Sequence, residues 1–354
     1  MRAKVAILTA PRTIKFIEED LPPVGENDMI IRMVSVGLCH SELPSYLGIG
    51  GTTISEYGYR TSTEVPKYPS GIGHEAVAVV AECGRSVKHF KTGDKVAGRV
   101  RGCVRDYQYI KNADVPTGSA MIFKIPDTDK DFRLCLSEPL ECTVNIIKAA
   151  SCEYGQRIAV VGCGIMGILA VAGLKKSVAK ELTAVDIVDE KLETAKKYGA
   201  TSTINSTRED PEEAAYRLTE GNFYDIVIEI TGSIKGLDTA LKLVKPAHKG
   251  AWHTEPYQGR GKVLIPSVYG KEEVFPRSLG TNLMLKSCTL HSVHPMYGID
   301  PCGNHVEGIE SFLDGRLPID EMVTHFVPFK DAAAGYEWLI NPPAGFMKGI
   351  VTFY

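Results

Sequence analysis

A glycine motif at residues 162–167 constrains the fold of this chain more than any other feature. The motif, Gly162-Cys163-Gly164-Ile165-Met166-Gly167, follows the apolar run Ile158–Val161 and opens a second apolar stretch that ends at Leu174. Between a strand and a helix, glycines at this spacing allow a tight turn and let backbone N–H groups approach a pyrophosphate. The sequence therefore predicts a strand, a turn and a helix that form a dinucleotide site. Its candidate residues are Gly162, Gly164, Ile165, Met166 and Gly167.

The same stretch has a membrane alternative. Ile158–Leu174 carries no charge and is about 17 residues long, near the lower limit for a membrane span. Glycines interrupt it at positions 162, 164, 167 and 173. A strand, a turn and a buried helix explain this pattern better, so we expect no membrane association.

Asp186 predicts the identity of the dinucleotide. A second apolar run, Leu182–Val185, ends at Asp186, at the distance from Gly162 that such motifs require. A carboxylate there accepts hydrogen bonds from ribose hydroxyls and repels a 2′-phosphate. Because Ile187 and Val188 supply no cation to neutralise that phosphate, NAD is favoured over NADP. An alternative role for Asp186 is a turn or N-cap residue.

The strand and helix patterns divide the chain into two predicted domains. Residues 149–290 alternate continuous apolar strands with helical patterns, among them Pro211–Leu218 and Ile234–Leu243, which predicts an α/β domain with a doubly wound parallel sheet. Residues 1–148 contain short apolar runs separated by turn residues, and residues 291–354 return to short strands with one helix at Ala332–Leu339. We expect a discontinuous β-rich domain, 1–148 plus 291–354, with the dinucleotide-binding domain inserted at 149–290.

Composition argues against several classes of partner and location. A net charge of −3 gives no electrostatic reason to bind nucleic acid or an anionic membrane. Nine cysteines are an odd number and too few for a disulfide scaffold in 354 residues, which favours a reducing compartment. The first residues carry too short an apolar run for a signal peptide. We expect a cytoplasmic protein.

Two short segments about 35 residues apart carry metal-binding side chains. Cys39 and the triplet Gly73-His74-Glu75 supply a thiolate, an imidazole and a carboxylate, all of which Zn²⁺ accepts. A metal site upstream of a dinucleotide site suggests metal-assisted hydride transfer. Taken singly, Cys39 could be a small buried residue and His74 a core histidine.

Further motifs fall in the order of a known family. The chain contains, in sequence, Val36-Gly37-Leu38-Cys39-His40-Ser41-Glu42, Gly73-His74-Glu75, Gly93-Asp94-Lys95-Val96, Glu138-Pro139-Leu140, the glycine turn and Asp186. Over essentially its whole length it resembles the zinc-dependent medium-chain dehydrogenase/reductase superfamily. The Glu-Pro-Leu element and the Glu directly after His74 resemble the polyol and sugar dehydrogenase branch, which includes sorbitol, threonine and archaeal glucose dehydrogenases.

The resemblance implies a GroES-like catalytic domain, a Rossmann domain and a cleft between them. It assigns Cys39 and His74 as zinc ligands, with Glu75 and Glu138 as further ligands. Because four bound side chains would leave a tetrahedral zinc no open position, we expect Glu75 or Glu138 to be exchanged for water or substrate. Zinc would polarise the alcohol or carbonyl oxygen, and Ser41 would relay the proton during hydride transfer to NAD. Ser41 could alternatively be a turn residue.

Three departures from the family pattern affect these expectations. Many relatives have four cysteines for a structural zinc where Gly98–Tyr109 has only Cys103, so we expect a single, catalytic zinc and no structural zinc. A relay histidine of many relatives is Pro44 here; His40 or water could replace it, or His40 could lie near the cofactor phosphates. Ala247–Gly270 is longer than usual and stays unassigned; it contains Trp252, His253 and Tyr257.

The substrate and the assembly rest on weaker signals. The polar segment Gly48–Tyr68 joins the two ligand segments and is either close to the site or a surface loop. With the branch resemblance, it favours a small polar alcohol or ketone, such as a polyol, sugar or cyclitol. His291 and His294 could contact nicotinamide or substrate, or lie in a solvated loop. The resemblance also implies a homodimer or homotetramer.

Two alternative functions remain open at this point. One is a zinc-free enone or quinone reductase of the same superfamily, a class that lacks the ligand set found here. The other is a catalytically silent protein that uses bound NAD as a sensor.

Overall fold

The computed structural model describes residues 1–54, 60–63, 66–117, 120–248, 259–267, 269, 277–294, 298 and 300–353. The chain divides into two compact units, Met1–Leu140 with His305–Tyr354, and Glu141–Asn304. It enters the second unit inside helix α2 (Ser137–Ala150) and returns inside helix α8 (Pro301–Leu313). The segment with Trp252, His253 and Tyr257 lies outside the described residues, as do the side chains of 51–65.

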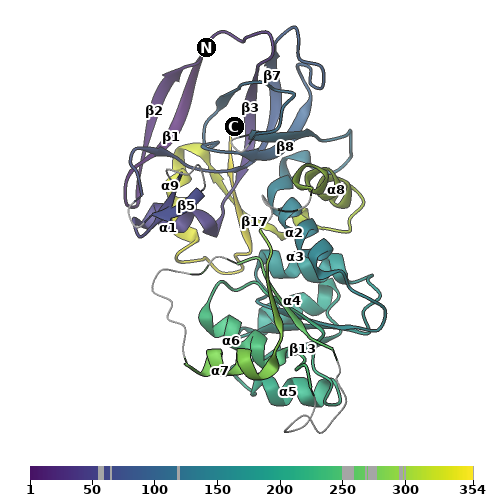
Figure 1. Ribbon diagram of the computed structural model, residues 1–354. Coiled ribbons are helices and arrows are strands. Elements are labelled where there is room, and N and C mark those ends of the chain that lie inside the picture. The colour runs from purple at the N-terminus through teal and green to yellow at the C-terminus, as the bar shows by residue number, and fades with distance from the viewer. Residues whose placement is uncertain are drawn as a thin grey trace. The chain divides into compact units, whose positions relative to one another are not determined.

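The first unit is built on a seven-stranded sheet. Its path runs through β10 (Ala120–Lys124), β8 (Lys95–Val100), β7 (Glu75–Cys83), β3 (Met29–Gly37), β18 (Lys348–Thr352) and β17 (Val323–Pro328), and β9 (Tyr107–Ile110) also pairs with β3. Figure 1 shows the C-terminal strands, in yellow, running alongside β3. The C-terminal segment is therefore part of the sheet that carries the first candidate ligands.

Smaller elements complete this unit. A second sheet contains β2 (Thr13–Asp20), β1 (Arg2–Ala10) and β6 (Ser70–Gly71), and β4 (Gly51–Ile54) pairs with β5 (Arg60–Thr63). The helices are η1 (His40–Glu42), α1 (Leu43–Leu47), η2 (Phe132–Leu134), η5 (Ile319–Met322), η6 (Phe329–Asp331) and α9 (Ala332–Trp338). An apolar cluster of this unit includes Met33, Val36, Ala76, Val100 and Tyr336. It places the hydrophobic core on one face of β3, β7 and β8.

The second unit contains a six-stranded parallel sheet. The strand order is β13 (Ser202–Asn205), β12 (Glu181–Asp186), β11 (Arg157–Val161), β14 (Ile226–Glu229), β15 (Lys262–Ile265) and β16 (Thr289–Ser292), and each neighbouring pair is parallel. The order reverses between β11 and β14. In open sheets of this kind, ligands bind outside the carboxyl ends of the strands at that reversal.

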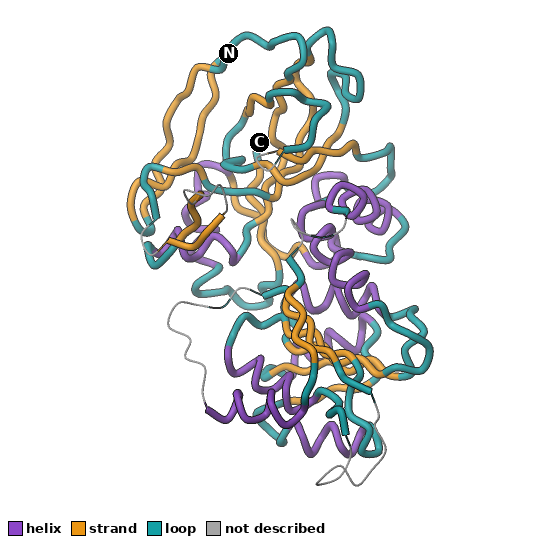
Figure 2. Tube along the Cα trace, viewed as in Figure 1, coloured by secondary structure: helices purple, strands orange, loops and turns teal. Residues whose placement is uncertain are grey.

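Helices cover both sides of this parallel sheet. They are α3 (Ile165–Leu174), α4 (Asp189–Tyr198), α5 (Pro211–Leu218), α6 (Ile234–Leu243) and α7 (Arg277–Lys286). α3 contacts α4, whereas α6 contacts both α5 and α7, and Figure 2 shows helices on either side of the strands. The prediction of a doubly wound parallel sheet is confirmed.

The apolar stretch Ile158–Leu174 forms the end of β11, the glycine turn and helix α3. The strand–turn–helix prediction is therefore confirmed for this stretch. Among the helices in the described ranges, none is long and apolar enough to cross a membrane.

Two helices differ from the sequence expectation. α2 begins at Ser137 with Pro139 in its first turn, where a proline ring is tolerated because its missing N–H has no partner to lose. α8 carries Gly303 and Gly308, which lower intrinsic helix propensity, yet it buries Ile309 and Phe312. Pro139 is thus compatible with the start of α2, whereas tertiary packing overrides the glycine signals in α8.

Candidate metal centre and dinucleotide turn

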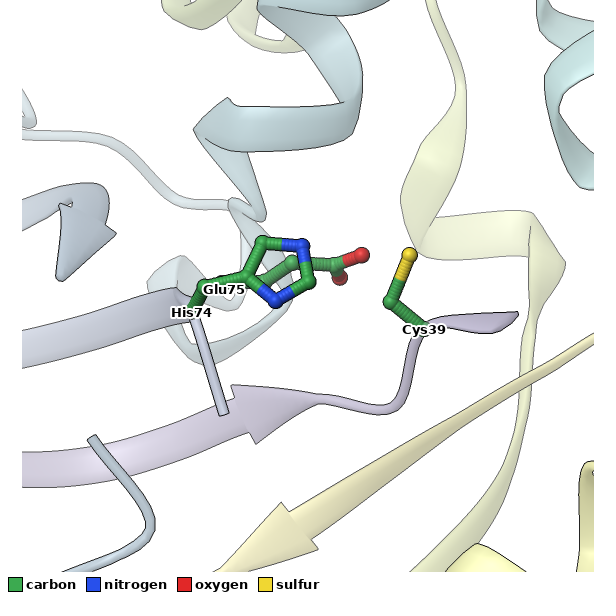
Figure 3. Close-up of side chains that lie close together, drawn as sticks. All are labelled: Cys39, His74 and Glu75. Atoms are coloured by element: carbon green, nitrogen blue, oxygen red, sulfur yellow. The ribbon is translucent and has the colours of Figure 1, made fainter. Parts of the chain in front are cut away.

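Three of the predicted ligands lie together in the first unit. Cys39 follows β3, while His74 and Glu75 lie at the start of β7, which pairs with β3 in antiparallel register. One ligand atom from each of Cys39, His74 and Glu75 lies within 4.8 Å of the others. Figure 3 shows the Glu75 carboxylate between the His74 imidazole and the Cys39 Sγ. Pairing of β3 with β7 therefore brings two segments distant in sequence to one point.

Two glycines make room for this arrangement. Gly37 lies opposite Glu75 in the β3–β7 pair, and a Cβ on Gly37 would lie 1.8 Å from Glu75 Oε2. Gly73 adopts a φ of 86°, a left-handed conformation that favours glycine. A side chain at Gly37 is thus incompatible with the observed position of the carboxylate.

Glu42 orients His74, a role that the sequence analysis does not assign. Glu42 Oε1 lies 2.6 Å from His74 Nδ1, and the buried Tyr336 donates its hydroxyl to Glu42 Oε2. A carboxylate hydrogen-bonded to one ring nitrogen fixes the ring and its tautomer, and makes the other nitrogen a better metal ligand. The sequence signal that could have pointed to this role is the presence of Glu42 in the same motif as Cys39. No such signal exists for Tyr336, which lies 294 positions from Glu42.

The charges around His74 favour its protonated form when no metal competes. Burial acts to lower the pKa of His74, but the charge of Glu42, hydrogen bonds with Cys39 and Glu42 and the charge of Glu138 together raise that pKa well above its usual value. A metal ion bound at His74 must therefore displace a proton that the surrounding carboxylates stabilise.

Glu75 is paired with a buried lysine, also not anticipated from sequence. Lys348 Nζ lies 2.7 Å from both Glu75 oxygens, but its geometry makes a hydrogen bond only to Oε1. Glu75 is 1% exposed and Lys348 4% exposed. Glu75 Oε2 is buried and accepts no hydrogen bond within the described protein. Burial raises the pKa of Glu75, and the Lys348 ammonium opposes that shift.

Glu138 lies beside the cluster but is not one of its three members. Its Oε1 is 3.8 Å from His74 Nε2 and accepts a 3.3 Å hydrogen bond from Arg99 Nε. Burial acts to raise the pKa of Glu138, but the charges of His74 and Arg99 outweigh it and lower that pKa. Glu138 therefore stays ionised next to the three-residue cluster.

The donor set fits a divalent metal ion of borderline softness. A thiolate, an imidazole and a carboxylate converge, as in zinc sites with three protein ligands and an open position. The orphaned Glu75 Oε2 is a buried acceptor that a cation would satisfy. The carboxyl groups Glu42, Glu75 and Glu138 outnumber the buried basic residues Arg99 and Lys348, so a cation that displaces the His74 proton would find an acidic environment.

Ser41 and His40 follow Cys39 in the short helix η1. The Ser41 hydroxyl donates to Cys39 Sγ across 3.3 Å, and both Ser41 and His40 are exposed. The structure thus brings Ser41 to the cluster from the solvent side. Cys103 is instead fully buried in the hydrophobic core, where burial raises the pKa of its thiol.

The glycine turn has the shape that the sequence predicts, but its glycines serve different purposes. Gly162 has a φ of 103°, and a Cβ at Gly167 would lie 1.8 Å from the Gly162 carbonyl oxygen. Local packing therefore explains both glycines. Gly164 precedes the first turn of α3, which holds Ile165 and Met166, and a Cβ there would meet nothing within 4 Å. Packing does not require Gly164, whereas close approach of a ligand to the α3 N-terminus would.

Asp186 holds the glycine turn through its backbone. Its Oδ2 accepts a 2.7 Å hydrogen bond from Cys163 N, and its Oδ1 accepts from Ile187 N and Val188 N. A carboxylate offers about four acceptor sites, so one of them remains for a ribose hydroxyl. The structure thus shows the turn role of Asp186, and its role toward a ribose stays a prediction. His291 on β16 and His294 are exposed.

Two family models match the chain. The model described as alcohol dehydrogenase GroES-like domain matches residues 25–120, and the model described as zinc-binding dehydrogenase matches residues 166–251. The first match contains Cys39, His74 and Glu75, and the second begins inside the glycine turn. The fold class predicted from sequence, a GroES-like β-rich domain plus a Rossmann α/β domain, is thus confirmed.

Curated relatives and solved structures agree with these matches. The chain is 28% identical to sorbitol dehydrogenase of Bacillus subtilis, covering 76% of this chain and 80% of that protein. It is 26% identical to D-xylulose reductase of Saccharomyces cerevisiae, covering 98% and 96%. The crystal structure of ECK1772 from Escherichia coli, an oxidoreductase/dehydrogenase of unknown specificity, superposes with a TM-score of 0.80 at 23% identity over all of both chains.

The two family models match residues 25–120 and 166–251, which include the ligand cluster and part of the glycine turn, and the match to D-xylulose reductase covers 98% of this chain. The chain belongs to the zinc-type medium-chain dehydrogenase superfamily, in its polyol dehydrogenase-like branch.

Proposed function

We propose that this oxidoreductase transfers hydride between NAD and a secondary alcohol of a polyol, sugar, cyclitol or similar polar substrate, with one zinc ion at Cys39, His74 and Glu75. The observation that carries the proposal is the convergence of these three ligand atoms within 4.8 Å, in the segment that matches the dehydrogenase GroES-like domain. A zinc-free reductase would have no use for this buried, charge-rich cluster.

Zinc at this site would polarise the substrate oxygen and so lower the pKa of an alcohol. The residues of the chain would do the rest. Glu42 and Tyr336 hold the His74 ring, and Ser41, exposed beside Cys39, is placed to pass the hydroxyl proton to solvent. A serine hydroxyl acts here as a relay rather than a base, because its own pKa is far above neutral.

The NAD assignment rests on the glycine turn and Asp186. Gly164 leaves open space at the N-terminus of α3, where backbone N–H groups and the helix dipole favour a pyrophosphate. Asp186 places a carboxylate at the end of β12, next to that turn, which disfavours a 2′-phosphate. A polar alcohol substrate is supported by the names of two relatives, sorbitol dehydrogenase and D-xylulose reductase.

We extend the proposal to self-association and location. β16 is an edge strand of the parallel sheet, and all four of its residues are exposed. Leu290 on this strand and Met284 and Leu285 on α7 are exposed apolar residues nearby in sequence. A sheet edge that no described strand covers, with apolar neighbours, favours pairing with a second copy. Sedimentation of the wild type and of Leu290→Lys would test this. All nine cysteines are free thiols, which fits the reducing cytoplasm.

A direct test combines metal analysis with turnover. Zinc content is measured first, and reduced nicotinamide is then followed by absorbance with NAD and a panel of polyols, sugars and cyclitols, with and without chelator. Cys39→Ser should lose zinc and turnover but keep NAD binding, whereas Cys103→Ser should keep all three. Absence of chelator-sensitive turnover on every hydroxyl substrate would contradict the proposal. NAD binding without turnover would instead favour a sensor.

A further inference from the structure

Arg99 is an unusual residue for the inside of a sheet. It lies on β8 directly opposite Glu75 on β7, and it is 4% exposed. Residues directly opposite in an antiparallel pair share a face of the sheet. The strand neighbour Val100 points to the other face, into the hydrophobic core. A guanidinium withdrawn from water is costly unless it is well paired, so Arg99 needs a partner on the face of the metal cluster.

Glu138 supplies a partner on that face. Arg99 Nε donates to Glu138 Oε1 at 3.3 Å, and the same Oε1 is the atom 3.8 Å from His74 Nε2. A metal ion held by His74 would therefore compete with the guanidinium for one oxygen. Two cations at one acceptor repel each other strongly in a buried, low-dielectric site.

Glu75 is held differently. Lys348 donates to its Oε1, while Oε2 accepts no hydrogen bond and the residue belongs to the cluster with Cys39 and His74. Lys348 Nζ lies 2.7 Å from both oxygens, but Oε2 has no hydrogen bond and keeps its lone pairs for a metal ion. The two carboxylates that the sequence could not distinguish therefore differ in their hydrogen bonds: Glu75 belongs to the cluster and has an oxygen without one, whereas the Glu138 oxygen near His74 accepts one from Arg99.

We propose that Arg99 is a positioning residue that keeps Glu138 out of the metal coordination sphere. Cys39, His74 and Glu75 are then the protein ligands, and the fourth position stays open to water or substrate. The inference rests on the proposed function, because it requires a metal ion at this cluster. It gives Arg99 a specific role beyond neutralising charge, since it decides whether an exogenous ligand can enter.

Cobalt(II) in place of zinc tests this without turnover, since its visible absorption reports coordination geometry. Imidazole is titrated into the cobalt-loaded full-length protein without nucleotide or substrate. In Arg99→Gln, the freed Glu138 should fill the open position, change the cobalt spectrum and raise the imidazole dissociation constant roughly tenfold or more. Glu138→Gln should bind imidazole about as the wild type does.

The double variant provides the decisive comparison. If Arg99 acts through Glu138, then R99Q/E138Q should match E138Q, because the two effects are coupled rather than additive. Arg157→Gln is a matched control: its partner Glu181 is 3.8 Å away and both side chains are 14% exposed, but the pair lies in the second unit. Its cobalt spectrum should equal that of the wild type.

The outcomes separate the two proposals. If cobalt added to the wild-type protein gives no thiolate charge-transfer band, both the proposed metal site and the role of Arg99 are overturned. A cobalt site that forms normally, with imidazole affinity unchanged in R99Q or reduced equally in R99Q and R99Q/E138Q, would overturn only the role of Arg99. If R99Q does not fold, Arg99→Lys can take its place, because it retains the buried charge. Its point charge should raise the imidazole dissociation constant above that of the wild type, but by less than the roughly tenfold increase expected for R99Q. An unchanged dissociation constant in Arg99→Lys would then refute the inference.

Discussion

Replacing Lys348 with methionine should destabilise the metal-free protein strongly. Lys348 Nζ lies 2.7 Å from Glu75 Oε2, and the two side chains are 5% and 1% exposed. Methionine keeps most of the volume, so packing changes little. The substitution leaves the buried Glu75 without its ammonium partner.

The magnitude follows from that burial. Removing one partner of a buried ion pair costs about 3 to 5 kcal/mol, because the remaining charge has lost both water and its counter-ion. For a domain of roughly 150 to 250 residues, 1 kcal/mol corresponds to about 2 to 4 °C in melting temperature. We therefore expect the transition of the first unit to fall by roughly 6 to 20 °C in the presence of a chelator.

The loss should depend on pH and on metal in a defined direction. Burial already raises the pKa of Glu75, and the Lys348 ammonium opposes the shift, so removing the ammonium raises that pKa further. As the pH falls, Glu75 takes up a proton and no longer needs a cation. The deficit of the variant should therefore be largest at alkaline pH and shrink under acidic conditions. Bound zinc should also reduce it, by supplying a different cation.

The assay is thermal unfolding in chelator and in zinc, at alkaline and acidic pH. Lys130→Met is the matched control, because the Lys130–Asp320 pair has the same type of contact at 3.0 Å but side chains that are 28% and 24% exposed. Its expected cost is below about 1 kcal/mol. Glu75→Gln combined with Lys348→Met removes both charges and should recover most of the loss. A melting temperature of K348M within experimental error of the wild type, or no recovery in the double variant, would refute the reasoning.

Three further predictions concern the two sites. Gly37→Ala should lower zinc content while keeping NAD binding, because its Cβ would lie 1.8 Å from a ligand oxygen. Gly164→Ala should weaken NAD binding while keeping zinc content. Metal analysis and NAD titration check both variants. Glu42→Gln should weaken zinc binding about 10- to 100-fold at alkaline pH. The substitution also removes a charge that raises the pKa of His74. Protons should therefore compete with zinc for His74 only at lower pH than in the wild type, which zinc affinities measured against a chelator at several pH values would show. Asp186→Ser should weaken NAD binding and improve NADP binding, as measured by titration with each dinucleotide.

Local patterns predicted the elements whose signals are complete within a short stretch. The sequence places helices at Pro211–Leu218 and Ile234–Leu243, and the structure has the same bounds. Each follows a capping side chain, Asp210 or Ser233, that accepts hydrogen bonds from first-turn N–H groups, which is a strong start signal. No helix was predicted over α2 (Ser137–Ala150), because Pro139 lowers helix propensity except in the first helical turn, where the structure places it.

The candidate site was predictable only in its ligands. Cys39, His74 and Glu75 stand in compact motifs, so residue type and spacing suffice to propose them. Their partners carry no such signal. Lys348 lies 273 positions from Glu75 and Arg99 lies 39 from Glu138, and each is an ordinary charged residue until the strands are paired. Sequence therefore proposes four ligands, whereas the structure distinguishes three clustered residues from a fourth held by a guanidinium.

The C-terminal segment is what turns these ligands into a site. Tyr336 in α9 holds the carboxylate that orients His74, and Lys348, the first residue of β18, neutralises Glu75. β18 pairs directly with β3, the strand that precedes Cys39. Before that pairing forms, the buried carboxylate has no ammonium partner and is costly to bury. Docking of the C-terminal strand and formation of the metal cluster are therefore coupled, which explains physically why ligands near the N-terminus share a folding unit with the last residues of the chain.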